Sequence, residues 1–174
     1  CTHPDVSMVQ PVRNPDDADI FDGAVARIPA MELDQSPAVL SLVCYELAAK
    51  ISGKEDPYRE LKREQNDLAL SLEEEMRARI HNSDDPLVTA LHLSAAGNII
   101  DLGTMHVQHI DVHGAIEQVL HESFAIDHTA EFRESLSRCA DFLSLLDNAG
   151  EIVLDKLLIE QLVKHTKVTA VVKG

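Results

Sequence analysis

The sequence predicts an α/β fold in which a helical amino-terminal region is followed by a parallel strand–helix–strand unit. The apolar run at residues 142–146 is bounded by polar residues and has the length of a buried strand. After the small pair Ala149-Gly150, apolar residues recur from residue 152 to residue 162 close to helical spacing. Residues 167–174 are rich in β-branched side chains and predict a second strand that ends in Lys173-Gly174. Two strands joined by one helix form a parallel pair with a right-handed crossover.

Composition limits both the size of the protein and its partners. The 174 residues allow one sizeable domain, or a small helical piece joined to a larger one, and the 45% apolar content suffices for a core. The formal net charge of −15 argues against a nucleic-acid or anionic-membrane surface, and it requires a local cation wherever a phosphorylated ligand binds. No apolar run reaches membrane-spanning length, and the start lacks a signal-peptide pattern. We therefore expect no nucleic-acid and no membrane partner.

The three cysteines are odd in number and widely separated, at Cys1, Cys44 and Cys139. Cys44 lies on an apolar helical face and Cys139 lies just before the first strand. This pattern favours free thiols in a reducing compartment over a disulfide or a metal site. We therefore expect a cytoplasmic protein.

The first 35 residues are poorly patterned. Four prolines interrupt them, so we expect an irregular lead-in that contains a short helix near residues 20–26. A clear helix follows, because Ser36 can cap it, Pro37 suits its first turn and Gly53 ends it.

More helices precede the strand–helix–strand unit. The pair Asp56-Pro57 repeats the cap-then-proline pattern and starts a helix that runs to about residue 80, with a mostly charged, solvated face. After a turn and cap at residues 82–86, a third helix ends near Ala95, where a glycine-flanked polar cluster at residues 96–103 begins. Two further helices are predicted at residues 114–124 and 129–138.

The junction between the first strand and the following helix contains the candidate metal-binding residues. Asp147 and Asn148 come directly after the strand, at the sheet edge where open α/β proteins bind ligands. Their oxygens are donors that a hard divalent cation prefers, and an anion carried by the cation could rest on the helix amides near Gly150. Asp and Asn at such a junction are also common helix N-caps. The local pattern leaves both interpretations open.

Two other polar clusters invite a binding role. Asn98 and Asp101 could face one pocket, although the same stretch serves equally as a helix C-cap and loop. His106, His109 and His113 have spacings that would gather imidazoles on one helical face, as in a zinc site. No cysteine or Glu-x-x-His pattern completes such a site, so we favour a solvated helix start or loop. The sequence contains no dinucleotide-binding glycine motif and no Walker loop.

Three stretches of the chain together resemble one family. Leu-Asp-Asn-Ala-Gly-Glu-Ile-Val-Leu-Asp at residues 146–155 resembles the signature of the metal-dependent damage-control phosphatases, long catalogued as domain of unknown function 89 and also known as an acidic-residue-methyltransferase-like metal-binding domain. Gly-Asn-Ile-Ile-Asp at residues 97–101 resembles the second signature, and Asp-Pro-Tyr-Arg-Glu-Leu-Lys-Arg-Glu-Gln-Asn at residues 56–66 resembles a third. The resemblance implies a Rossmann-like three-layer αβα core. It also implies hydrolysis of phosphate monoesters of damaged or surplus phosphorylated metabolites, such as sugar phosphates.

The resemblance also implies roles for single residues. Asp147 and Asn148 would hold a divalent cation (Mg²⁺, Mn²⁺, Co²⁺ or Ni²⁺) and so form the catalytic pair. The amides of Gly150 and Glu151 would cradle the phosphate, and Lys173 would add a positive charge. Asn98 and Asp101 would contact the substrate or order the water molecules around the metal. Asp155 would not touch the metal itself but would support the residues that do.

In the family, the second strand leads into a loop with a further metal-binding Asp and then into more strands, and none of this follows Gly174. The resemblance covers half to two-thirds of a family member, so we expect the core to be incomplete at its carboxyl end. The strand edge at residues 168–172 would then need a partner. Either a carboxyl-terminal segment of the same protein or a second copy of the chain could cover it.

The predicted division of the chain is an irregular lead-in at residues 1–35, a helical region at 36–96, and the first part of the metal-binding phosphatase core at 97–174. Two other function classes remain. An S-adenosylmethionine-dependent carboxyl methyltransferase is compatible with an α/β core, although no glycine-rich first-strand loop supports it. A non-catalytic fragment would act as a binding module. Metal-dependent phosphomonoester hydrolysis separates the phosphatase from both, and S-adenosylmethionine binding separates the other two.

Overall fold

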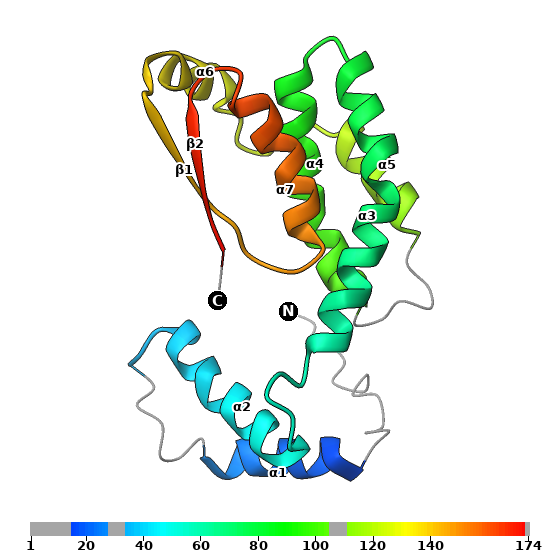
Figure 1. Cartoon of the computed structure of the whole chain (residues 1–174), viewed down its shortest axis with the longest axis vertical. Coiled ribbons are helices and arrows are strands. Elements are labelled where there is room, and N and C mark those ends of the chain that lie inside the picture. The colour runs from blue at the N-terminus through cyan, green and yellow to red at the C-terminus, as the bar shows by residue number, and fades with distance from the viewer. Residues whose placement is uncertain (1–14, 28–33, 105–110, 173–174) are drawn as a thin grey trace, which may run out of the picture. The chain divides into compact units, whose positions relative to one another are not determined.

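The structure of the chain, a computed structural model, describes residues 15–27, 34–104 and 111–172 (Figure 1). It divides into two compact units, one ending at Arg59 and one beginning at Glu60. Within these described ranges, nine elements follow in chain order. They are α1 (Pro15–Arg27), α2 (Pro37–Ser52), α3 (Arg59–Asn82), α4 (Pro86–Thr104), α5 (Val112–His121), α6 (Thr129–Arg138), β1 (Asp141–Leu145), α7 (Glu151–Leu162) and β2 (Lys167–Val171). The described part is therefore a mostly helical α/β structure.

The first unit consists of α1 and α2, which pack against each other. Gly23 allows the close approach, because a Cβ atom there would lie 3.0 Å from Leu47 Cδ2. Helix α2 begins at Pro37 and ends at Ser52, where Gly53, with a left-handed φ of 65°, caps it, and this confirms both predicted boundaries. The side chain of Ser36 makes no capping hydrogen bond. Helix α1 is longer than the short helix expected within the lead-in, because Pro15 is tolerated in a first helical turn.

The second unit contains the sheet. Strands β1 and β2 are parallel and joined by α7, which confirms the strand–helix–strand prediction. Their register pairs Asp141 with Lys167 and Leu145 with Val171. One face of the sheet is covered by side chains of α4, α6 and α7, and the other face exposes Leu143 and Leu145. The covering cluster is Leu87, Leu91, Phe132, Leu136, Leu158 and Leu162, packed against Phe142 and Val168.

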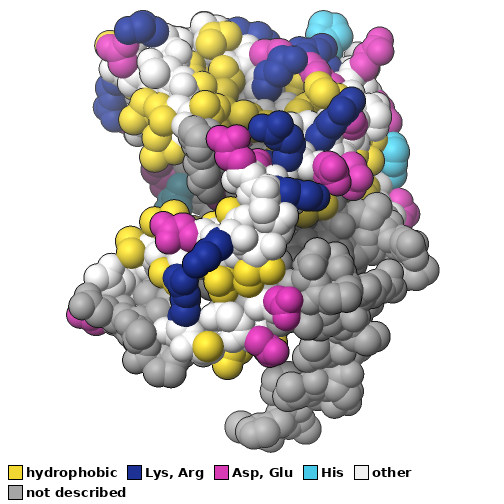
Figure 2. Space-filling model, turned by 60° about the horizontal axis from the view of Figure 1, so that its bottom comes forward, with side chains coloured by type: hydrophobic (Ala, Val, Ile, Leu, Met, Phe, Trp, Pro, Cys, Tyr) yellow, Lys and Arg dark blue, Asp and Glu magenta, His cyan; other side chains and the backbone are white. Residues whose placement is uncertain are grey.

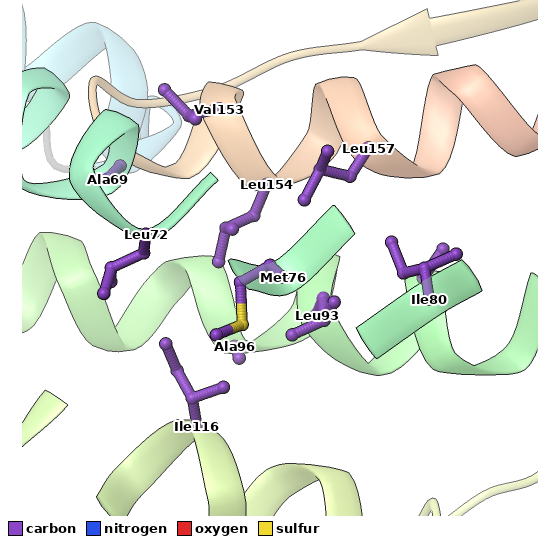
Figure 3. Close-up of a cluster of buried hydrophobic side chains, with 11 residues drawn as sticks. Ala69, Leu72, Met76, Ile80, Leu93, Ala96, Ile116, Val153, Leu154 and Leu157 are labelled. Atoms are coloured by element: carbon purple, nitrogen blue, oxygen red, sulfur yellow. The ribbon is translucent and has the colours of Figure 1, made fainter. Parts of the chain in front are cut away.

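The main core lies among α3, α4, α5 and α7 (Figure 3). Apolar residues at helical spacing on α3 face the interior, and the Met76 side chain points toward Leu154 of α7 and Ile116 of α5. Leu154 and Leu157 of α7 are fully buried in this core, and Leu158 and Leu162 pack on the sheet side, so α7 is held on both sides. The buried members of the core are Ala69, Leu72, Met76, Ile80, Ala90, Leu93, Ala96, Ile116, Val153, Leu154 and Leu157.

Helix α4 differs most from its prediction. It does not end near Ala95 but runs to Thr104, so the expected turn at residues 96–103 is wrong and the expected boundary between residues 96 and 97 falls inside a helix. Glycine has low helix propensity and is typical of a helix end. At Gly97, however, close packing of α4 against α7 compensates for that weakness, since a Cβ atom there would lie 2.9 Å from Glu151 Cγ.

Ion pairs join the solvent-facing sides of α3 and α7. The carboxylate of Glu73, on α3, pairs with Lys156 of α7 at 2.6 Å and with Arg77 of its own helix at 2.5 Å. Arg77 also pairs with Glu160 of α7. Figure 2 shows basic and acidic side chains lying beside one another on the face of the described atoms that it presents. Exposed pairs of this kind each contribute little to stability. None of the helices in the described part of the chain combines the length and the apolarity that a membrane span requires.

Candidate active site

The candidate site is the turn between β1 and α7. Leu146 still belongs to the sheet, because its N–H donates to the carbonyl of Val171 at 2.8 Å. Asp147 is exposed and Asn148 is partly buried directly after it, at the carboxyl end of a parallel strand, as predicted. The N-cap position of α7 is occupied by Gly150. Neither Asp147 nor Asn148 is therefore the N-cap residue, although the Asn148 carbonyl accepts from the Ile152 N–H at 3.2 Å.

Gly150 turns the chain from the strand into the helix. Its φ of 78° and ψ of −55° lie where a side chain would be strained, so this position requires glycine. Its N–H donates to Oδ1 of Asn66, on α3, at 2.8 Å. In the structure this amide, which we predicted to bind phosphate, is engaged by a protein acceptor.

Helix α4 supports the same turn from another side. Gly97 is buried against the first residue of α7, and its missing side chain leaves room for Glu151, which is itself 9% exposed. One turn earlier on α4, the Ser94 hydroxyl donates to Oδ1 of Asp155 at 2.5 Å. The three signature stretches, far apart in sequence, thus meet at one place through Asn66, Gly97 and the turn.

Asp155 has an unusual electrostatic environment. Burial raises the pKa of its carboxyl above the ordinary value, and the negative charge of Asp147 raises it further. The hydrogen bond from Ser94 opposes these two effects but does not outweigh them. Asp147 and Asp155 are therefore close enough to interact. A cation beside Asp147 would relieve the repulsion between the two carboxylates.

The other predicted ligands fall in different places. Asn98 is exposed on α4, next to Gly97. Asp101 belongs to the same helix, but its side chain is outside the described part, and Lys173, His106 and His109 also lie outside the described residues. His113 lies on α5, and its Nε2 atom is 3.4 Å from Oε2 of Glu75.

Asp147 and Asn148 are neighbouring residues whose side chains carry oxygen donors. The residues that the structure describes include no group of three His, Cys, Asp or Glu side chains able to hold a metal ion. Carboxylate and carboxamide oxygens suit a hard cation, and Mg²⁺ in proteins commonly keeps several waters beside one or two protein ligands. The donors present therefore fit a hard divalent cation.

Sequence reasoning did not single out Asn66, Ser94 or Gly97 as site residues. Asn66 is the last residue of the stretch at 56–66 that resembles the third signature, and this was the only signal that pointed to it. Its contact joins residues 84 positions apart, so no local pattern reveals it. Ser94 lies outside all three stretches and gave no signal.

Comparisons with known proteins place the chain among relatives. The sequence model of the damage-control phosphatase ARMT1-like domain matches residues 11–174. An uncharacterized protein of Methanocaldococcus jannaschii is 34% identical over 144 residues, covering 79% of this chain and 47% of that protein. A damage-control phosphatase of Archaeoglobus fulgidus is 34% identical over 128 residues, which cover 72% of this chain and 44% of that protein. Damage-control phosphatase PH1575 of Pyrococcus horikoshii is 25% identical over 139 residues, which cover 79% of this chain and 47% of that protein.

The fold has a counterpart of known structure. The crystal structure of PH1575, a DUF89 family protein of Pyrococcus horikoshii, matches this fold with a TM-score of 0.71 at 22% sequence identity. The match covers 94% of this chain and 56% of that chain. At this identity the likeness establishes the fold alone. The chain spans about half the length of the curated relatives that it matches.

Proposed function

Because this chain belongs to the damage-control phosphatase ARMT1-like family, we propose that the protein hydrolyses phosphate monoesters of damaged or surplus phosphorylated metabolites, sugar phosphates among them. The observation that carries the proposal is the pair Asp147-Asn148 at the carboxyl end of β1, in a turn supported by α3 and α4. Two relatives bear the name damage-control phosphatase. Since the chain spans about half of their length, the activity of the whole protein is itself part of the proposal.

For the cofactor we propose a divalent cation, Mg²⁺, Mn²⁺, Co²⁺ or Ni²⁺. The carboxylate of Asp147 and the carboxamide oxygen of Asn148 would hold it, because both are hard oxygen donors next to each other at the sheet edge. When bound, such a cation neutralises phosphoryl oxygens and lowers the pKa of a coordinated water. It also supplies the positive charge that a chain of net charge −15 needs in order to bind a phosphorylated ligand.

The chain's own residues would bind and orient the phosphate. Helix α7 begins at Glu151 and directs the positive end of its dipole toward the turn, where an anion is favoured. We keep the amides of Gly150 and Glu151 as the proposed phosphate contacts, and the Gly150 amide also donates to Asn66. Ser94 holds Asp155 in place behind the site. We keep three residues as proposed contacts to substrate: Asn98, Asp101 and Lys173.

Two further points belong to the proposal. We infer that β1 and β2 form part of a Rossmann-like three-layer core in the intact protein, which the parallel pairing with α7 on one face supports. We also infer that the protein works in the cytoplasm. The free thiol of Cys139 supports this, since reducing compartments preserve free thiols.

The test is metal-dependent hydrolysis of p-nitrophenyl phosphate by the intact protein, together with calorimetric Mn²⁺ binding. Asp147→Ala should abolish both, while Asp141→Ala should leave both unchanged. Asp141 makes a matched control because it lies at the other end of the same strand and pairs with Lys167 at 3.0 Å. Unchanged Mn²⁺ affinity in Asp147→Ala would overturn the assignment. If the wild-type protein hydrolyses nothing, calorimetry with S-adenosylmethionine separates a methyltransferase from a binding module.

Asn148→Asp separates a metal ligand from a residue that only supports the start of α7. Aspartate has nearly the same shape as asparagine and keeps the backbone carbonyl that accepts from the Ile152 N–H, so a purely structural role tolerates the change. Beside a bound phosphate, by contrast, the added negative charge opposes the substrate. We expect near-normal melting of Asn148→Asp with a strongly reduced rate of hydrolysis. A wild-type rate would favour the structural role.

A further inference from the structure

The candidate cation site lies between two anchors. On the strand side, the hydrogen bond from the Leu146 N–H to Val171 fixes the chain one residue before Asp147. On the helix side, the hydrogen bond from the Gly150 N–H to Asn66 fixes it two residues after Asn148. The strand-side anchor is a bond between backbone atoms. The helix-side anchor depends on a side chain, so a single substitution can remove it.

The helix-side anchor holds a backbone conformation that needs support. Gly150, at φ 78° and ψ −55°, has the backbone angles of a γ-turn. Glycine reaches this conformation at no steric cost but can also adopt many others, so the hydrogen bond to Asn66 helps to select it. Only an acceptor can pair with an N–H, so the atom that faces Gly150 is the carboxamide oxygen of Asn66.

Asn66 is itself held firmly. It lies on α3 between the buried residue Gln65 and, one turn further on, the fully buried Ala69, which belongs to the main core. The contact with Gly150 is partly buried, which limits competition from water. Through this hydrogen bond, Asn66 ties the turn at Gly150 to α3 and so to the helical core.

We propose that Asn66 is a positioning residue that sets the geometry of the Asp147–Asn148 cation site through the Gly150 amide. The inference rests on the proposed function for the identity of the ligand, but not for the contact itself. Loss of the acceptor releases the Gly150 amide, so the turn can change its conformation and move the two donors relative to each other. Loss of a residue that orients metal ligands typically lowers metal affinity about 10–100-fold, and we expect a loss in this range for Asn66→Ala.

Asn66→Asp provides the rescue variant. It keeps an acceptor for the Gly150 N–H, and its negative charge favours a nearby cation. We expect wild-type or higher Mn²⁺ affinity. Lys156→Ala is the matched control, because it breaks another link between α3 and α7, the pair of Lys156 with Glu73, without touching the turn. We expect it to leave Mn²⁺ affinity unchanged.

The experiment has two readouts on the intact protein. The first is the exchange rate of the Gly150 amide hydrogen, measured by NMR without metal. It should rise in Asn66→Ala and stay slow in Asn66→Asp and Lys156→Ala. The second is Mn²⁺ affinity by calorimetry, measured well below the melting temperature.

Unchanged exchange of the Gly150 amide in Asn66→Ala would overturn the inference, and so would equal losses of Mn²⁺ affinity in Asn66→Ala and Lys156→Ala. An Asn66→Asp variant as weak as Asn66→Ala would also overturn it, because the acceptor would then not be the cause. A wild-type protein that binds no divalent cation would refute the proposed function instead. The exchange rates would in that case still decide whether Asn66 shapes the turn.

Discussion

Gly97→Ala tests whether the close approach of α4 to α7 sets the position of the candidate site. A Cβ atom at residue 97 would lie 2.9 Å from Glu151 Cγ and 3.1 Å from Glu151 Cα. The Cγ atom can swing away, but the Cα atom belongs to the backbone. The start of α7 must therefore retreat by about 0.3 Å, from 3.1 Å to the 3.4 Å at which ordinary contact begins. The turn that carries Asp147 and Asn148 must move with it.

Two opposing contributions decide the effect of Gly97→Ala on stability. Replacing an interior helical glycine by alanine gains about 1 kcal/mol of helix propensity. Overpacking a well-packed site costs about 1–3 kcal/mol. We expect a net loss of about 1 kcal/mol in the free energy of unfolding. Ala95→Gly, at an exposed position two residues earlier on α4, measures the propensity contribution by itself.

Denaturant unfolding and Mn²⁺ calorimetry of the intact protein provide the assay. Besides the loss of stability, we expect Mn²⁺ affinity to fall on the order of tenfold, as for other perturbed supports of metal ligands. A Gly97→Ala protein that is about 1 kcal/mol more stable than wild type, with unchanged Mn²⁺ affinity, would refute the reasoning. It would show that α4 and α7 have room for the extra carbon.

The remaining predictions concern stability. Burial opposes ionisation of Asp85, yet the Arg133 side chain and the Val88 amide hold the pKa of that carboxyl below its ordinary value. Its charge therefore stabilises the fold above the unfolded pKa, and this contribution is lost as the pH falls through the lowered folded pKa. Asp85→Ala should cost about 1 kcal/mol through the lost cap. Asp85→Asn, which keeps the cap acceptor, should have a lower free energy of unfolding than wild type at neutral pH but an equal one in strong acid. A difference in the free energy of unfolding that stays constant with pH in urea titrations would contradict this. Leu157→Ala should cost about 2–5 kcal/mol because Leu157 is fully buried. Leu145→Ala, 73% exposed, should change the free energy of unfolding by less than about 0.5 kcal/mol, and equal losses for the two leucines would contradict the burial.

Local pattern predicted the parts of the fold that local forces determine. The strand at residues 142–146 and the helix after Gly150 were predicted within one residue, because a buried run and a helical period leave clear signals. Helix α6 was predicted with its observed bounds. The end of α4 was wrong because Gly97 has the signature of a C-cap, whereas its actual role is to let α7 approach. Only tertiary packing distinguishes these two roles.

In the candidate site, too, local pattern predicted some features and tertiary packing decided the others. The pattern placed Asp147 and Asn148 at the carboxyl end of the strand, where the structure has them. It could not reveal that the Gly150 amide is engaged by Asn66, because that contact depends on how α3 packs against α7. The pKa shift of Asp155 likewise arises from burial and from the charge of Asp147, which the sequence does not display.

The bond between Asn66 and Gly150 joins residues 84 positions apart, so the turn acquires its shape only when α3 and α7 have come together. An unfolded chain lacks this turn, and a cation that binds there binds the native state alone. By mass action, such a ligand at a hundred times its dissociation constant raises the free energy of unfolding by about 2.7 kcal/mol. The supply of the metal would then govern how much folded protein a cell contains, apart from any effect on the reaction rate.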